Sequence, residues 1–410
     1  MKKMRLIVAI EDRLIRVAGN YYSHHLSYDS FWYRYRTAFD QVDIVTRVLD
    51  KDDVPEGWGM VNKDKVGVIP LPPYRGPYQY LAKMLAIKKA IKKIFHYGDA
   101  VILRIPGNTG TLLLKELPLG YPYGVEVMVD PWDGFAPGSV KSFTRPYFRW
   151  RWTKNLKIQC RGTVAASYVT EHALQRRYPP SKDAYTTYYS SIELDDRFVL
   201  LDASKRFASI QTTPKRLAGD EPPVRLGFIG SFSQGYKLPD VHIKALARCA
   251  TKGANVTLEM IGDGALLPKM KRLARKLGVG DRVIFRGRLP GGKPIMDAID
   301  NFDLFLNATA AEGLPRVVIE AMSRGCPCVA SRVAGTPELL EESYLVPRHK
   351  VTALADTILR VLAKPKAMAN AVERNIGIAR NYCRDVLQPR RLAFYQALRE
   401  RTEKYLSKRS

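Results

Sequence analysis

Short apolar runs alternate with segments of helical periodicity along the whole chain. Five apolar runs in the first half are expected to form strands, at residues 4–10, 42–49, 100–105, 125–129 and 164–170. Five more are expected in the second half, at residues 224–229, 256–261, 282–285, 304–306 and 326–330. Strands that alternate with helices predict an α/β fold whose parallel sheets carry helices on both faces.

The helical segments show the same order. Residues 78–95 place apolar side chains at helical spacing, and the expected buried stripe comprises Leu81, Met84, Leu85, Ile91 and Ile94. Ligands of doubly wound sheets bind beyond the carboxyl ends of the strands, so the functional residues should follow strand ends.

The chain is 410 residues long, which exceeds the size of one ordinary hydrophobic core. Periodicity fades between residues 198 and 223, where Pro, Lys and Asp collect, so a hinge is expected at 213–223. The interpretation is two Rossmann-like domains, residues 1–212 and 213–388, that face each other across a cleft. Residues 389–410 are expected to form a helix that returns to the first domain.

The most informative stretch is DLFLNATAAEGLPRVVIEAMSRGCPCVASR, residues 303–332. It reads as strand, small-residue loop, helix and strand. Pro315 favours a helix start, and Gly325 is expected to end that helix. Glu312 lies just before the helix and Glu320 lies inside it.

A helix start of this kind can bind an anion. Its first N–H groups lack partners within the helix and sit at the positive end of the dipole. Pro315 has no N–H, so Arg316, Val317 and Val318 would donate. Carboxylates accept hydrogen bonds from sugar and ribose hydroxyls. A nucleotide sugar, with hydroxyls on both sides of a diphosphate, suits this arrangement.

The two glutamates, set in AEGLPRVVIEAM and followed by GCPCVAS and GTPELL, resemble the paired-glutamate motif of retaining glycosyltransferases of family 4. This family of group 1 glycosyltransferases has the GT-B fold. The resemblance is strong over residues 224–346 and faint before them. It implies sugar transfer from a UDP- or GDP-linked donor with retention at the anomeric carbon. No cofactor or metal is implied beyond the nucleotide sugar as co-substrate.

The resemblance also implies residue roles. Glu312 would contact the sugar, Glu320 would accept from the ribose hydroxyls, and Gly262 with Arg288 would flank the base. Lys237, in the loop that begins Gly230-Ser231, would neutralise the diphosphate. The family usually has an arginine in that loop, where this chain has Ser231 or Phe232.

Two first-domain residues are also candidates. Gly19 is the only glycine in the loop expected at residues 15–22, where the family approaches the donor phosphates. Asp130 follows a strand where the family often has a histidine, and a turn carboxylate is an equally open interpretation. The expected catalytic residues are Glu312, Lys237 and Asp130. The expected donor-binding residues are Gly19, Gly230, Ser231, Lys237, Gly262, Arg288, Glu312, Gly313, Leu314, Pro315, Arg316, Val317 and Glu320.

Charge adds a possible partner. The net charge is +26 and the pI is about 9.8, which implies an anionic partner. Basic residues gather at 88–93, and at 141–161 seven of them, from Lys141 to Arg161, alternate with five aromatic residues and no acid. We expect this surface to dock on an anionic membrane and the enzyme to glycosylate a glycan or lipid-linked acceptor. A soluble anionic glycan remains an alternative.

The remaining features favour a cytoplasmic protein that is peripheral on the inner face of the plasma membrane. No apolar run is long enough to span a bilayer. The first ten residues are expected to form a strand, not a signal peptide. The five cysteines are scattered, which suggests a reducing compartment.

Other functions are weaker interpretations. A nucleotide-sugar epimerase would use the same architecture. A nucleic-acid-binding protein would explain the charge, but no zinc, helix-turn-helix or RNA-binding signature is present, and no nucleic acid is expected. Asp50 and Asp52 form an acid-x-acid pair that can bind a metal–diphosphate, although a solvated turn is the expectation.

Overall fold

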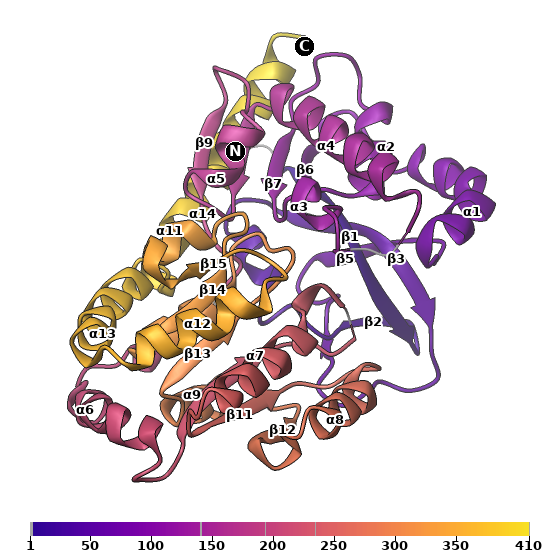
Figure 1. Cartoon of the computed structure of the whole chain (residues 1–410). Coiled ribbons are helices and arrows are strands. Elements are labelled where there is room, and N and C mark those ends of the chain that lie inside the picture. Colours follow the sequence, from indigo (N-terminus) through magenta and orange to yellow (C-terminus); the bar gives the residue numbers. More distant parts are fainter. Residues whose placement is uncertain (1–2, 140–141, 193, 234, 410) are drawn as a thin grey trace.

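The computed structural model describes residues 3–139, 142–192, 194–233 and 235–409. Its strands form two sheets, one in each half of the chain (Figure 1). The expected α/β fold with two doubly wound units is confirmed.

The first sheet is mainly parallel, with β5, β3, β1, β6, β7, β8 and β9 side by side. Its inner strands are rich in Val, Ile and Leu and are buried on both faces, as parallel strands between helices require. The strands are β1 (Arg5–Val17), β2 (Asn20–Ser23), β3 (Gln41–Asp50), β4 (Gly59–Met60), β5 (Val66–Leu71), β6 (Ala100–Ile105), β7 (Gly124–Val127), β8 (Ala165–Tyr168) and β9 (Tyr185–Tyr188).

The second sheet is parallel throughout, in the order β12, β11, β10, β13, β14, β15. Because β10 and β13 are central neighbours, the loops that leave them open at the same place. The strands are β10 (Val224–Ile229), β11 (Val256–Ile261), β12 (Val283–Gly287), β13 (Leu304–Asn307), β14 (Cys328–Ser331) and β15 (Leu345–Val346).

Helices cover the faces of both sheets (Figure 1). In the first half these are α1 (Gly76–Ile91), α2 (Asn108–Glu116), α3 (Pro131–Gly134), α4 (Arg145–Arg161) and α5 (Ala173–Arg177). The others are α6 (Ser204–Ala218), α7 (Pro239–Thr251), α8 (Leu267–Lys276), α9 (Lys293–Asp300), α10 (Arg316–Ser323), α11 (Thr336–Leu339), α12 (Val351–Leu362), α13 (Pro365–Arg380) and α14 (Arg384–Ser407).

The last helix, α14, crosses back to the first sheet. It packs against β6, β8 and β9, and Figure 1 shows it, in yellow, running along β9. Phe394, Tyr395 and Leu398 are fully buried there. The Arg391 guanidinium donates to the carbonyls of Ser190 (2.9 Å) and Ile192 (3.1 Å). The chain end therefore completes the core of the first unit.

Three local expectations are wrong. The loop expected at 15–22 is a hairpin, because β1 continues to Val17 and turns at Ala18 and Gly19 into antiparallel β2. The irregular stretch expected at 198–223 contains α6, so the boundary placed at 212/213 falls inside a helix. Buried arginines account for this helix, since Arg216 pairs with Asp303 at 2.6 Å.

The third difference lies in α1, which ends at Ile91 and not at residue 95. Ile87 and Ile91 are buried, whereas Leu81 and Leu85 of the expected core stripe are exposed. The apolar residues of α1 therefore lie on two different faces of the helix. One face packs on the sheet, and the other is open to solvent.

The return of α14 yields a stability prediction. Phe394→Ala removes a fully buried ring that packs against Gly124 of β7, and should cost about 3–5 kcal/mol of unfolding free energy. Urea unfolding monitored by circular dichroism measures this. Lys404→Ala, an exposed change in the same helix, is the control and should stay within about 0.5 kcal/mol. Equal stability of both variants would contradict the packing described for α14.

Candidate functional site

A cavity of about 380 Å³ lies where the two units face each other. From the first unit it is lined by Pro106 after β6, by Asp130 after β7 and by Trp152 of α4. From the second unit it is lined by Tyr236 and Glu312. These residues follow strand ends in both sheets, which is where doubly wound folds bind ligands.

Lys237 and Glu312 are in contact in this region. The Lys237 Nζ lies 2.5 Å from the Glu312 Oε1, and the two side chains are only 17% and 12% exposed. Lys237 ends the turn after β10 and Glu312 follows β13, so the pairing of β10 with β13 brings them together. The predicted phosphate lysine and sugar glutamate thus share one partly desolvated site.

Backbone bonds hold the two loops in this arrangement. The Tyr236 carbonyl accepts from the Ala310 N–H (2.8 Å) and from the Thr309 hydroxyl (3.0 Å). Tyr236 also lines the cavity, and the Lys237 Nζ lies 5.5 Å from the centre of its ring. Tyr236 is not among the site residues predicted from the sequence. The feature of the sequence that indicates a role for Tyr236 is its position next to Lys237 in GSFSQGYK.

The start of α10 follows the expected design with one change. Pro315 is the N-cap residue and Arg316 begins the helix, so both lie as the motif predicts. Val318 already donates its N–H to the Pro315 carbonyl at 3.1 Å. The donors that this turn directs at an anion are therefore the N–H groups of Arg316 and Val317.

Glu320 lies in α10, partly buried. Burial raises the pKa of this carboxyl to about 7, and the nearby Arg316 opposes that rise. Because folding raises its pKa above 4.5, the folded protein binds the proton more tightly, and unfolding free energy falls as pH increases from 4.5 to about 7. A hydrogen-bond partner for the carboxylate, such as a diol, would relieve the cost of this buried charge.

Three of the expected glycines, Gly230, Gly262 and Gly313, lie where two backbone segments approach each other closely. Gly262 has a φ of +141°, and a Cβ there would lie 1.9 Å from the Gly230 carbonyl oxygen. A Cβ at Gly313 would lie 2.2 Å from the Met128 carbonyl oxygen of the first unit. Side chains at Gly262 and Gly313 would therefore displace the exit loops of β10 and β11 or separate the two units.

Four other expected residues have simpler surroundings. Ser231 is exposed and its hydroxyl accepts from the Ser233 N–H at 3.1 Å. Arg288 and Arg316 are exposed at the carboxyl side of the second sheet, and Leu314 is buried. Ser231 carries no charge, so Lys237 is the cation among the described residues of the β10 loop, and it meets the cavity through its contact with Glu312.

Asp130 is buried within a network of its own. It caps α3 through the Trp132 N–H (2.9 Å), accepts from the Tyr178 hydroxyl (2.6 Å) and pairs with Arg177. Burial is the largest cause of its raised pKa. It lines the cavity, so its catalytic role stays a prediction, although its oxygens already have partners.

Gly19 sits at the tip of the β1–β2 hairpin, with a φ of +81° that suits glycine in a tight turn. Near the expected donor residues, the first unit instead contributes His24 and His25, which follow β2. Burial is the main cause of their lowered pKa values, and the charges of Arg288 and Arg316 contribute. Nothing in the sequence indicated that these histidines face the expected donor residues.

Polar contacts tie the units together beside the cavity. Asp133 accepts from Arg348 at 3.0 Å, across the two halves of the chain. The Glu338 carboxylate accepts from three successive N–H groups at the start of α5, those of Glu171 (2.7 Å), His172 (3.0 Å) and Ala173 (2.6 Å). A carboxylate from one unit thus caps a helix of the other.

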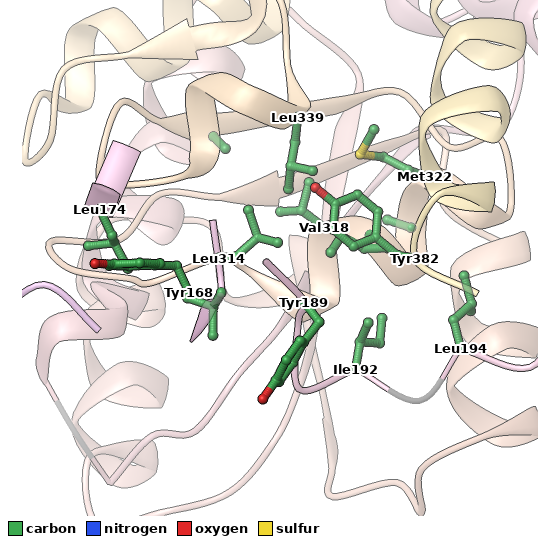
Figure 2. Packing of buried hydrophobic residues seen from close by; sticks show 14 of the residues in the cluster. Tyr168, Leu174, Tyr189, Ile192, Leu194, Leu314, Val318, Met322, Leu339 and Tyr382 are labelled. Carbon is green, nitrogen blue, oxygen red and sulfur yellow. The ribbon is translucent and has the colours of Figure 1, made fainter. Parts of the chain in front are cut away.

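Apolar packing reinforces these contacts. Figure 2 shows Leu314 and Val318 of the second unit close to Tyr168, Leu174 and Tyr189 of the first. All of them belong to one buried cluster. The loop that carries Glu312 is therefore anchored by a buried side chain two residues further on.

Two α/β units that face each other are the architecture of the GT-B fold, and a family match and curated relatives support glycosyltransferase activity. Residues 223–364 match the family described as glycosyl transferases group 1, so the second unit carries the group 1 domain. The predicted group 1 glycosyltransferase with the GT-B fold is confirmed, and membership of the retaining family 4 stays a prediction.

Named relatives agree with that assignment. Protein CapJ of Staphylococcus aureus is 27% identical over 92% of this chain and 91% of its own length. The N-acetyl-alpha-D-glucosaminyl L-malate synthase of Bacillus anthracis is 28% identical over 48% of each chain. Among solved structures, WaaG, a glycosyltransferase involved in lipopolysaccharide biosynthesis, superposes with a TM-score of 0.62 at 16% identity, over 95% of this chain and 98% of that one. HepE of Anabaena in complex with UDP-glucose superposes with a TM-score of 0.61 at 14% identity, over 98% and 100%.

The raised pKa of Glu320 yields a pH prediction. If the ionised carboxylate accepts from the ribose, affinity for a nucleoside diphosphate sugar should fall as pH drops through about 7. Isothermal titration between pH 5.5 and pH 8.5 measures this, since the diphosphate diester of the ligand does not titrate in that range. Glu320→Gln should bind more weakly at high pH and lose most of the pH dependence. An unchanged pH profile in the variant would remove Glu320 from the donor site.

Proposed function

We propose that the chain transfers a sugar from a nucleoside diphosphate sugar to a growing lipid-linked glycan, with retention at the anomeric carbon. The observation that carries this proposal is the contact between Lys237 and Glu312 at the interdomain cavity, beside the start of α10. HepE, a structural relative, has been solved with UDP and with UDP-glucose. That supports a nucleotide sugar as the donor here.

The proposed chemistry uses fixed charges. The bond between the anomeric carbon and the β-phosphate oxygen breaks, and the electron pair leaves with the diphosphate. Lys237 and the N–H groups of Arg316 and Val317 stabilise that charge as it develops. The acceptor hydroxyl attacks from the same face, and its proton passes to the departing phosphate oxygen. Glu312 orients the sugar, and its contact keeps Lys237 extended toward the phosphate.

The acceptor side is apolar. A second cavity of about 300 Å³ lies between the start of α1 and α4, lined by Pro77, Tyr80, Phe148 and other residues. It shares Phe135 and Trp152 with the interdomain cavity. An apolar trench that adjoins the reaction site suits the lipid-proximal part of an acceptor better than a free polar glycan.

The same two helices expose an unusual surface, which we call the α1–α4 face. Leu85 is 78% exposed and Trp150 is 57% exposed, among other apolar side chains: Tyr78, Leu81, Phe143, Tyr147 and Ile158. The exposed cations of these helices and of the residues just after α1 include Lys88, Lys89, Lys92, Lys93, Lys154 and Lys157. Lys141, part of the predicted basic stretch, lies outside the described residues. No helix in the described part of the chain has the length and apolar character needed to cross a membrane.

Exposed aromatic residues among lysines are typical of surfaces that insert into a headgroup layer. We therefore infer that the α1–α4 face rests on an anionic membrane and that the trench opens toward the lipid. We propose accordingly that the enzyme works at the inner face of the plasma membrane, in synthesis of a cell-surface polysaccharide. Several relatives are named for lipopolysaccharide synthesis, which supports that assignment.

Kinetics of two variants test the proposed chemistry. Lys237→Ala should lower kcat/KM for the donor by about 10- to 100-fold, since a charge-assisted contact contributes about 1.5–3 kcal/mol. Glu312→Gln should lower mainly kcat. A donor panel assayed with a lipid-linked acceptor measures both, and the anomeric configuration of the product reports retention.

The matched control is Lys244→Ala, which removes a lysine that pairs with Asp240 on the surface of α7. Its donor kinetics should match the wild type. If Lys237→Ala and Lys244→Ala behave alike, Lys237 is not a phosphate ligand. An inverted product would contradict retention and leave the glycosyltransferase assignment intact.

Vesicle binding tests the α1–α4 face. The protein should co-sediment with vesicles that contain phosphatidylglycerol, and not with phosphatidylcholine vesicles, because each cation near such a surface contributes about 1 kcal/mol. Reversal of Lys89, Lys92 and Lys154 to Glu should abolish binding. The control variant changes the same number of charges: Lys269, Lys271 and Lys276 on α8 are replaced by Glu. It should retain most of the vesicle binding. Equal losses in the two variants would mean that net charge, and not this face, drives binding.

A further inference from the structure

A large groove in the first unit has no part in the chemistry described above. Its volume is about 680 Å³, and it lies over the second half of β1, the end of β3, the loop after β5 and the first turns of α1. We call it the cationic groove. Its polar and aromatic lining includes Asp12, Arg13, Lys51, Trp58, Arg75 and Lys83.

The groove has an excess of positive charge. Among its described lining residues, Arg13, Lys51, Arg75 and Lys83 are cations and Asp12 is the single carboxylate. Burial lowers the pKa of Arg13, and the charges of Arg47 and Arg75 lower it further. The Arg47 guanidinium lies 3.4 Å from the Glu11 carboxylate, so the charge of Arg47 is already paired. The Lys83 ammonium donates to the carbonyl of Pro73 at 2.7 Å, a neutral partner that leaves its charge uncompensated. An excess of cations along a groove attracts an anion into it.

The side chains also suit a sugar. Trp58 is half-buried, so its indole gives the groove an aromatic wall with a polar N–H. Guanidinium groups bind carboxylate and phosphate oxygens in pairs. Arg75 and Arg13 are both exposed and available for such contacts. An acidic sugar presents a ring for the indole and an anionic group for the arginines.

The groove is linked to the expected donor residues. The Trp58 ring lies 6.0 Å from that of His24, which lies 3.9 Å from that of His25. The charge of Arg288 lowers the pKa of both histidines, and the charge of Arg316 lowers that of His25. Tyr74 forms a wall common to the groove and to the apolar trench. A chain of sugars that leaves the reaction site can therefore reach the groove along the protein surface.

We propose that the cationic groove is a subsite for an acidic sugar of the acceptor glycan, one that carries a carboxylate or a phosphate, with Arg13, Arg75 and Lys83 holding the anion and Trp58 packing on the ring. Its role as an acceptor subsite rests on the proposed transferase function. The binding itself does not, because the groove lies entirely in the first unit.

Isothermal titration with soluble oligosaccharides tests the subsite without any donor. The probes are tetragalacturonate, its carboxyl-reduced neutral counterpart, a phosphorylated mannan oligosaccharide and the same mannan without phosphate. Each acidic probe that fits should bind at least about tenfold more tightly than its neutral partner, as expected for charge-assisted contacts. Preference for one acidic probe identifies whether the anion is a carboxylate or a phosphate.

Variants locate the site. R13Q/R75Q/K83Q should weaken binding of the preferred probe by at least about tenfold. R272Q/R275Q/K276Q also removes three positive charges, from exposed positions on α8, and should change the affinity for the probe less than about twofold. Trp58→Phe should retain most binding and Trp58→Ala should lose it. Arg75→Glu, a single exposed change, serves if the triple variant unfolds.

The outcomes separate the two proposals. Equal binding of acidic and neutral probes, or equal losses in the two triple variants, would overturn the subsite, even in a protein that transfers sugar. Response to anionic vesicles alone, with no soluble probe bound, would also overturn it. Probe binding in a protein that turns over no nucleotide sugar would sustain the groove as a binding site for acidic sugars, and would refute both the transferase proposal and the groove's role as an acceptor subsite.

Discussion

The apposition of the two units is the constraint on which the site depends. Neither sheet alone forms the cavity, since Asp130 and Trp152 come from one unit and Tyr236 and Glu312 from the other. Two contacts hold the two units in their relative position: Glu338 caps α5, and Arg348 pairs with Asp133. Gly313 allows the closest approach, because its lack of a side chain lets the Glu312 loop lie against the Met128 carbonyl. The packing around Leu314 in Figure 2 turns this approach into a buried contact.

The charged groups of the molecule are concentrated at separate sites with different proposed roles. At the cavity, a lysine and a glutamate lie 2.5 Å apart and partly desolvated, beside the positive end of α10. Glu320 is held at a raised pKa by burial, so it is poised to change charge near neutral pH. The excess of positive charge lies elsewhere, on the α1–α4 face and in the cationic groove. The net charge of +26 thus has large contributions outside the donor site, on the surfaces that we propose to bind a membrane and an acidic sugar.

The sequence predicted those parts of the site that are local in the chain. The strand, loop and helix around Glu312 appear as expected, because proline, glycine and the apolar period act within a few residues. Lys237 was predicted from its loop, and its contact with Glu312 follows from the adjacency of β10 and β13. Glu338, Arg348, His24 and His25 were missed, since their partners come from distant segments. The hairpin at Gly19 and the helix α6 were missed because tertiary contacts, such as Arg216 with Asp303, outweighed weak local signals.

The central claim is that the start of α10 and Lys237 hold a nucleoside diphosphate at the interdomain cavity. A crystal structure with UDP or GDP bound tests it most directly. The account predicts the β-phosphate within hydrogen-bond distance of the Arg316 and Val317 N–H groups, with the Lys237 Nζ in contact and the ribose hydroxyls at Glu320. A nucleotide bound elsewhere, or one whose phosphates point away from α10 and Lys237, would contradict it.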